Sequence, residues 1–179
     1  LVAAGKAAWQ MAHAARACLQ DNFCGGVVVT KYGHVNGEIA DVACFEGGHP
    51  VPDENSLRGT DAALALTEDL TESDTVVFLL SGGGSALFEK PLLPLAELQD
   101  VTNQLLAAGA DIVEINTIRK RLSAVKGGRF ARHCAPAQVF AVVLSDILGD
   151  PLDMIASGPT YPDSSSCAQA LDIAKRYGP

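Results

Sequence analysis

This sequence lacks the features of several common protein classes, and each absence narrows what the chain does. Lys and Arg number 13 against 21 Asp and Glu, so the formal net charge is −8 at pH 7. An acidic chain has little with which to neutralise the phosphates of nucleic acid or an anionic membrane surface. The longest wholly apolar run, residues 139–144, is far too short to cross a bilayer. We therefore expect no nucleic-acid partner and no membrane association.

The cysteines form no recognisable disulfide or zinc pattern. Their number is odd, their spacing is scattered and no two of them stand as C-x-x-C: Cys18, Cys24, Cys44, Cys134 and Cys167. Such a set is typical of free thiols in a reducing compartment and argues against a disulfide framework or a zinc site. Charged residues also interrupt the first twenty positions, which therefore carry no secretion signal. The sequence predicts a cytoplasmic protein.

Three familiar motifs of phosphate binding or catalysis are missing. Gly5-Lys6 is followed by Ala7, where a Walker loop requires Ser or Thr. The dinucleotide fingerprint G-x-G-x-x-G also fails. Gly82 and Gly84 of Gly82-Gly83-Gly84 could fill its first two glycine positions, but Leu87 stands at the last one. The same leucine breaks the G-x-S-x-G elbow of the hydrolases around Ser85.

What is present is the alternation of an α/β domain. The chain has 179 residues, of which 48% are apolar and 19% charged, as is usual for one globular domain. Apolar runs predict strands at 1–4, 26–30, 39–46, 76–80 and 138–144, and helical spacing predicts helices at 7–20, 54–70, 95–108, 112–122 and 167–177. Gly109 suits a left-handed cap after the third of these helices. Alternating strands and helices predict a mostly parallel sheet covered on both faces, a three-layer αβα fold.

The most informative stretch is a buried strand that ends in three glycines. Val76 to Leu80 is wholly apolar, and Ser81-Gly82-Gly83-Gly84-Ser85 follows at once. Glycines let the backbone bend sharply and let a ligand approach the main chain. Successive N–H groups in such a turn form an anion-binding concavity, and ligands of open α/β sheets collect at the carboxyl ends of strands. The loop predicts a site for an anion or a polar small molecule; a tight turn without a ligand is the simpler alternative.

Polar groups also follow the other predicted strands, and parallel strands bring their carboxyl ends to one edge. Lys6 precedes a helix, where an ammonium and the helix dipole together form a phosphate clamp, although an ordinary solvated lysine is the alternative. His49 suits either a base or a hydrogen-bonding support of its loop. Asp146 and Asp150 suit a hard cation such as Mg²⁺, whereas Asp146 alone would also suit a helix N-cap.

A basic cluster stands on the predicted helix at 112–122. Asn116 and Arg119 are three residues apart and share one face of the helix. An arginine binds a carboxylate in bidentate fashion better than a lysine does, and Lys126 adds a further cation nearby. The alternative is a solvated basic helix end that complements the helix dipole.

Seven motifs together resemble the amino-terminal domain of the glycerate 2-kinases, the enzymes that also carry a MOFRL domain and of which some are labelled hydroxypyruvate reductases. They occur in order along nearly the whole chain: Gly5-Lys6-Ala7-Ala8, residues 48–53 (GHPVPD), 81–87 (SGGGSAL), 116–123 (NTIRKRLS) and 126–129 (KGGR), Ser145-Asp146 with Gly149-Asp150, and 155–160 (IASGPT). The resemblance implies a Rossmann-like domain that phosphorylates glycerate at its 2-hydroxyl, giving 2-phosphoglycerate, with ATP and Mg²⁺. Because the sequence begins at Leu1 and stops at Gly178-Pro179 just after a predicted helix, we expect residues 1–179 to be a domain truncated at both ends. The resemblance further implies that the carboxy-terminal MOFRL domain is absent and that the fragment is inactive alone.

Phosphoryl transfer requires mainly positioned cations and anion-binding backbone, and the predicted site offers both. Under the resemblance Lys6 and Asp146 are catalytic, and Asp146 and Asp150 bind Mg²⁺. The expected substrate- or phosphate-binding residues are Ser81, Gly82, Gly83, Gly84, Ser85, His49, Asn116, Arg119 and Lys126, with Arg119 or Lys126 on the glycerate carboxylate. The expected partners are glycerate and ATP, and a homo-oligomer stays open.

Two other interpretations come from other classes of protein. An NAD(P)H-dependent hydroxypyruvate reductase would explain the older label, but it should carry the dinucleotide fingerprint that is missing here. A non-catalytic module that binds a small anion would use the same loops, so the loops alone do not distinguish it from a kinase.

Overall fold

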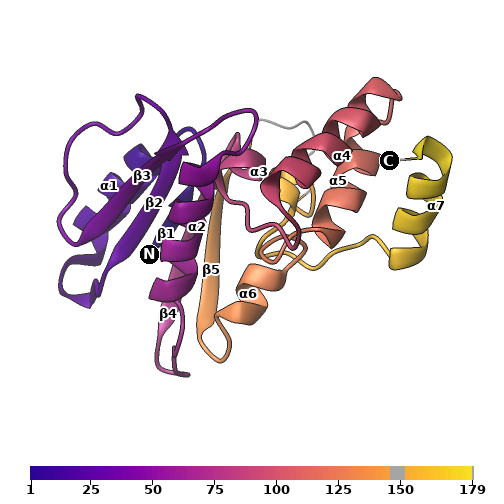
Figure 1. Cartoon of the computed structure of the whole chain (residues 1–179). Helices are drawn as coiled ribbons and strands as arrows, with labels where there is room; N and C mark the ends of the chain where they lie inside the picture. Colours follow the sequence, from indigo (N-terminus) through magenta and orange to yellow (C-terminus); the bar gives the residue numbers. More distant parts are fainter. Residues whose placement is uncertain (146–151, 179) are drawn as a thin grey trace.

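A computed structural model describes residues 1–145 and 152–178 of the chain (Figure 1). Its sheet has five strands: β1 (Val2–Ala4), β2 (Gly26–Lys31), β3 (Val42–Gly47), β4 (Thr75–Ser81) and β5 (Gln138–Leu144). The strand order is β3-β2-β1-β4-β5, and every neighbouring pair is parallel. The predicted α/β fold with a parallel sheet is confirmed.

Helices cover the two faces of the sheet, as expected. Helix α1 (Ala8–Leu19) packs on one face, and α2 (Glu54–Leu66) lies on the opposite face with two short helices, α3 (Gly84–Leu87) and α6 (Arg129–His133). Three further helices, α4 (Leu95–Ala107), α5 (Ile112–Arg121) and α7 (Cys167–Tyr177), lie together beside the sheet (Figure 1). Two 3₁₀ turns, η1 (Gln20–Asn22) and η2 (Ile155–Ser157), complete the described elements.

Aromatic packing fixes the face that lies beneath the glycine-rich loop. Phe78 of β4, Phe88 after α3 and Phe130 of α6 are fully buried, and their ring centroids lie 5.1 to 5.3 Å apart. Such tilted and edge-on contacts add to the stabilisation that burial provides. This cluster ties the segment after β4 to the face that α2 and α6 cover, so the loop between them has a rigid base.

The strand order places a topological switch point between β1 and β4. The chain leaves β1 toward β2 and β3 on one side of the sheet and then returns to β4 and β5 on the other. Ala4 pairs with Leu80 at the end of these two strands. The loops that follow β1 and β4 therefore begin side by side, at the position where open α/β sheets bind ligands.

Several expectations about single elements need correction. Strand β3 begins at Val42, three residues later than predicted. Strand β5 is not buried but forms the edge of the sheet. Its Val139 and Val143 pack against the cluster that contains Phe130, whereas Phe140, Val142 and Leu144 are exposed because among the described residues no helix covers that face of the strand. The short helices α3 and α6 were not predicted, since each begins after a left-handed glycine that reads as a turn. The left-handed conformation predicted for Gly109 is confirmed, with φ of +83°.

Candidate active site

The loops after β1 and β4 are joined by direct hydrogen bonds. The Lys6 amide donates to the Gly82 carbonyl at 2.9 Å, and the Ala7 amide donates to Ser81 Oγ at 3.0 Å. Gly5 must lack a side chain, because a Cβ there would lie 2.3 Å from Ser81 Oγ. Ser81 is buried and its hydroxyl is engaged by the backbone. It therefore positions the two loops against each other.

Gly83 lies beneath two side chains that the sequence analysis selected. A Cβ at this position would lie 2.7 Å from Cδ2 of His49 and 3.4 Å from Cγ of Lys6. Its φ of +88° is also a left-handed conformation that disfavours other residues. Lys6, His49 and the glycine-rich loop therefore meet at one place, although they come from three different strand ends.

The loop that carries His49 is fixed by the first turn of α2. Asp53 caps this helix: its Oδ1 accepts from the Ser56 amide at 2.9 Å, and its Oδ2 accepts from the Tyr32 hydroxyl at 2.7 Å. Partial burial acts to raise the pKa of Asp53, but these hydrogen bonds outweigh it and hold that pKa below its usual range. The ionised cap therefore anchors one wall of the site at neutral pH.

Two cations converge on the Ser85 carbonyl at the other end of the glycine-rich loop. Arg119 Nη2 donates to it at 2.9 Å and Lys126 Nζ at 3.0 Å, while Lys126 also donates to the Phe88 carbonyl at 2.9 Å. Both cations pair with Oε2 of Glu89 at 3.3 Å. Glu89 and Lys126 are fully buried, whereas the Arg119 side chain keeps 12% of its surface exposed. Of the two predicted cations, only Arg119 therefore presents surface to a ligand.

Burial changes the acid–base behaviour of Lys126. Its pKa is lowered from 10.5 to about 8: desolvation is the main cause and the neighbouring Arg119 adds to it, while Glu89 opposes both. Sequence reasoning missed Glu89 because a single glutamate before Lys90 gives no local sign of burial.

Nε of Arg119 has no hydrogen-bond partner among the described residues. Such an unmet buried donor costs about 1–3 kcal/mol and calls for an explanation, for which a bound ligand is one candidate.

A chain of side-chain hydrogen bonds runs beneath the loop to α5. Asn116 Oδ1 accepts from Ser157 Oγ at 3.1 Å, and Ser157 Oγ lies 3.4 Å from Ser85 Oγ. Ala156 and Ser157 both have positive φ, a strained conformation outside glycine that often marks functional sites. Ser157 was not selected from the sequence, although it stands in one of the seven quoted motifs; its conformation could not be read there.

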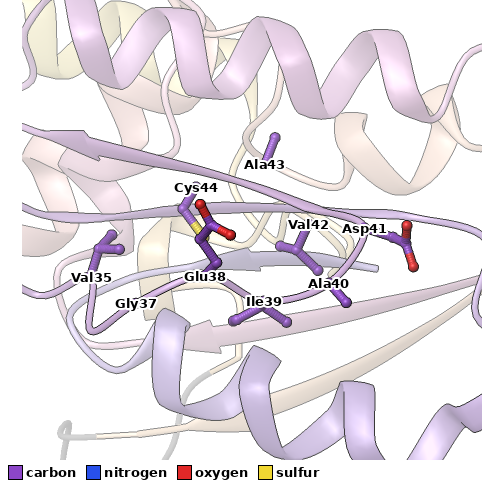
Figure 2. A pocket seen from close by; sticks show the side chains of 9 residues that line it. All are labelled: Val35, Gly37, Glu38, Ile39, Ala40, Asp41, Val42, Ala43 and Cys44. Atoms are coloured by element: carbon purple, nitrogen blue, oxygen red, sulfur yellow. The ribbon is translucent and has the colours of Figure 1, made fainter.

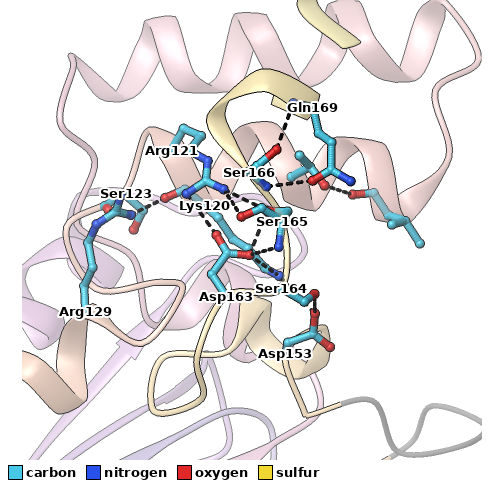
Figure 3. Close-up of polar contacts among 12 residues, drawn as sticks. Lys120, Arg121, Ser123, Arg129, Asp153, Asp163, Ser164, Ser165, Ser166 and Gln169 are labelled. Carbon is cyan, nitrogen blue, oxygen red and sulfur yellow. Dashed lines mark hydrogen bonds and ion pairs between the residues drawn. The ribbon is translucent and has the colours of Figure 1, made fainter. Parts of the chain in front are cut away.

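A second ionic cluster fixes the far side of α5 (Figure 3). The buried Lys120 lies 3.5 Å from Asp153 and 3.3 Å from Asp163, and Arg121 lies 3.0 Å from Asp163. Although burial opposes it, hydrogen bonds from Ser165 and the charge of Lys120 lower the pKa of Asp163. These contacts tie α5 to the segment before α7. The helix that carries Asn116 and Arg119 is thus held from both sides.

A wide hollow of about 950 Å³ lies elsewhere, along residues 35–44 at the β3 edge of the sheet (Figure 2). One continuous segment lines it, and its charged side chains are the carboxylates Glu38 and Asp41. A hollow with that lining repels an anion. The polar groups that suit an anion meet instead at the ends of β1 and β4.

The structure therefore brings most of the predicted site residues together. Lys6 and His49 meet the glycine-rich loop at Gly83, while Asn116, Arg119 and Lys126 meet it around Ser85. The predicted Mg²⁺ ligands, Asp146 and Asp150, lie outside the described residues. Within residues 1–145 and 152–178 no group of three His, Cys, Asp or Glu side chains could hold a metal ion. The same residues contain no helix long and apolar enough to span a membrane.

Comparison with known proteins places the chain in a family. Residues 1–179 match the family described as "Domain of unknown function (DUF4147)". The chain is a DUF4147 domain. Over 99% of its length it is 58% identical to the D-glycerate 2-kinase of Thermotoga maritima and 43% identical to the glycerate 2-kinase of Pyrococcus horikoshii. The resemblance drawn from the seven motifs is confirmed.

Solved structures agree with this placement. The DUF4147 domain superposes on the crystal structure of the Thermotoga maritima glycerate kinase with a TM-score of 0.96, covering 99% of this chain and 43% of that one. A Pyrococcus horikoshii structure, 42% identical, gives a TM-score of 0.91 and is covered over 40% of its chain. A relative from Agrobacterium vitis that is provisionally named as a hydroxypyruvate reductase is 43% identical. The chain spans about two fifths of the length of these relatives.

Proposed function

We propose that this chain carries part of the active site of an ATP-dependent glycerate 2-kinase, acting as the amino-terminal domain of a longer enzyme. The proposed reaction phosphorylates glycerate at its 2-hydroxyl and gives 2-phosphoglycerate. The observation that carries the proposal is the convergence of Lys6, the glycine-rich loop and Arg119 at the switch point of the sheet. The names of the relatives support the same reaction.

The glycine-rich loop suits the phosphates of a nucleotide. The amides of Gly83, Gly84 and Ser85 donate no hydrogen bond to any described residue, and in this proposal they donate to phosphate oxygens. A Cβ at Gly84 would lie 2.8 Å from Ala156 and one at Gly83 would lie 2.7 Å from His49, so the loop can pack this closely only with glycine at both positions. When bound, ATP supplies the phosphoryl group that is transferred.

The side chains around the loop would share the remaining tasks. In this proposal the Lys6 ammonium stabilises negative charge on the phosphoryl group, and His49 contacts the substrate beside Gly83. Arg119 binds an anionic group at the rim. Buried Lys126 holds the Ser85 carbonyl and acts as a positioning residue, and Ser81 and Asn116 act in the same way through their hydrogen bonds. Mg²⁺ and its ligands Asp146 and Asp150 remain part of the proposal.

A single substitution tests the central claim. In the full-length protein, Lys6→Ala should lower glycerate-dependent ADP release by at least a hundredfold while the circular dichroism spectrum stays unchanged. Lys175→Ala, at an exposed position on α7, is the matched control and should keep wild-type turnover. Near-normal turnover of Lys6→Ala would remove Lys6 from the mechanism. ³¹P NMR of the product would show whether the 2-hydroxyl is the acceptor.

The same preparation separates the two alternatives. Oxidation of NADH by hydroxypyruvate, followed by absorbance, would indicate a reductase. Binding of ADP or glycerate without ADP release from ATP would indicate a non-catalytic module. Glycerate-dependent ADP release without NADH oxidation is the result that the kinase proposal requires.

A further inference from the structure

An apolar groove of about 210 Å³ opens next to the proposed phosphate site. It lies between α4 and α5, and the loop at residues 50–52, directly after His49, closes it. Buried Leu98, Pro52 and Ile115 line it together with the exposed side chains of Leu106 and Ile112. Exposed leucine and isoleucine side chains around a concave surface are typical of a ligand site.

Arg119 connects this groove to the glycine-rich loop. The same side chain that lines the groove donates from Nη2 to the Ser85 carbonyl at 2.9 Å. At the other wall, the residue before Pro50 is His49, whose ring would contact a Cβ at Gly83. A ligand in the groove would therefore lie one side chain away from the anion site.

The size and polarity of the groove select one part of a nucleotide. A volume of about 210 Å³ is below the ~300–1,000 Å³ that is usual for a whole drug-sized ligand, so it suits a single flat ring system. Among the described residues that line it, Arg119 alone is charged, and it stands at the end that faces the loop. Three polar side chains, Gln99, Thr102 and Asn103, stand along α4. An apolar slot with a few polar groups and no carboxylate fits a purine base whose phosphates extend toward Arg119.

We propose that this groove binds the adenine ring of the nucleotide and that Arg119 separates the base from the phosphates. The inference rests on the proposed function, because it assigns a subsite to the nucleotide of that reaction. Gln99 Nε2 donates to the Pro52 carbonyl at 2.9 Å and so ties α4 to the loop at 50–52. This contact holds the two walls of the groove together and shapes it in advance for a flat ring.

Two variants of the full-length protein test the subsite. Leu106→Asp places a carboxylate at an exposed wall, where folding should tolerate it, and Thr102→Trp fills the groove. Each should raise the KM for ATP and the calorimetric Kd for ADP at least tenfold, with the KM for glycerate changed less than twofold. Leu171→Asp, at an equally exposed leucine on α7 outside the groove, should change neither.

Two outcomes would overturn the base subsite, and a third would distinguish its failure from a failure of the proposed function. Unchanged KM for ATP in Leu106→Asp would exclude the groove as the base subsite. An equal rise in the KM values for ATP and glycerate would show that the groove supports the whole site and not ATP in particular, which also overturns the inference. If the wild type released no ADP with glycerate, the proposed function would fail. The ADP affinities of the same variants would still show whether the groove binds the base of a nucleotide.

Discussion

The buried Lys126 makes a quantitative prediction about stability and pH. Its pKa is about 8 in the folded protein against 10.5 for an exposed lysine. Between these two values the unfolded chain keeps a proton that the folded chain has lost. Because the unfolded state then binds more protons, stability must rise as the pH rises through this window. The full pKa difference corresponds to about 3 kcal/mol, most of which is gained between pH 7 and pH 10.

The substitution Lys126→Met removes this titration. We expect the unfolding free energy of the wild type, minus that of the variant, to increase by about 2–3 kcal/mol from pH 7 to pH 10. Urea unfolding of the full-length protein, followed by circular dichroism at several pH values, measures the difference. Taking the difference cancels the other groups that titrate in this range.

The control and the refutation are equally direct. Lys175→Met removes an exposed lysine of α7, and its stability should run parallel to that of the wild type across the same pH range. A difference between the wild type and Lys126→Met that stays constant from pH 7 to pH 10, where linkage requires a rise of about 2–3 kcal/mol, would refute the reasoning. It would mean that the ion pair with Glu89 offsets the whole free-energy cost of burying the Lys126 ammonium.

Three further predictions concern the loop, a cap and the second ionic cluster. Gly83→Ala should lower kcat/KM at least tenfold. Gly109 has a similar positive φ but no atom within 4 Å of its Cβ, so Gly109→Ala should cost only about 1 kcal/mol of stability. Equal kcat/KM values for the two variants would contradict the close approach of His49 to Gly83. Asp53→Ala should lose about 1 kcal/mol in thermal unfolding and raise the KM for glycerate, while Ser166→Ala, which uncaps α7, should lose only stability. Asp163→Asn should cost about 3 kcal/mol at pH 7; the pKa of Asp163 is lowered, so this cost should shrink as the pH falls through that pKa, and a constant cost would refute the pairing.

The elements, and the edge of the sheet that carries the candidate site, followed from local patterns. Apolar runs such as Val76 to Leu80 predict buried strands, and the glycines after them predict a turn of close approach. Because the alternation of strands and helices requires right-handed crossovers, the parallel sheet and the edge shared by its loops could also be deduced. Lys6, His49 and the loop at 81–85 were placed at the correct strand ends for this reason.

The roles of the cations could not be deduced in this way. Arg119 and Lys126 look alike in the sequence, yet one reaches the rim and the other is fully buried against Glu89. Burial depends on packing between segments more than thirty residues apart, as in the contact of Lys126 with the Phe88 carbonyl. The strained backbone of Ser157 and the exposed face of β5 have the same origin, since both depend on which distant elements lie against them.

The sequence by itself determined the fold class, the family and the strand ends that carry the site, because turn chemistry and hydrophobic period are local properties of the chain. Only the tertiary structure decided which polar groups reach the surface of the candidate site and which hold the loop from beneath. The physical reason is desolvation. A charge removed from water requires a partner, and for Lys126 and Glu89 the partners come together only when the glycine-rich loop packs against the segment that follows α5.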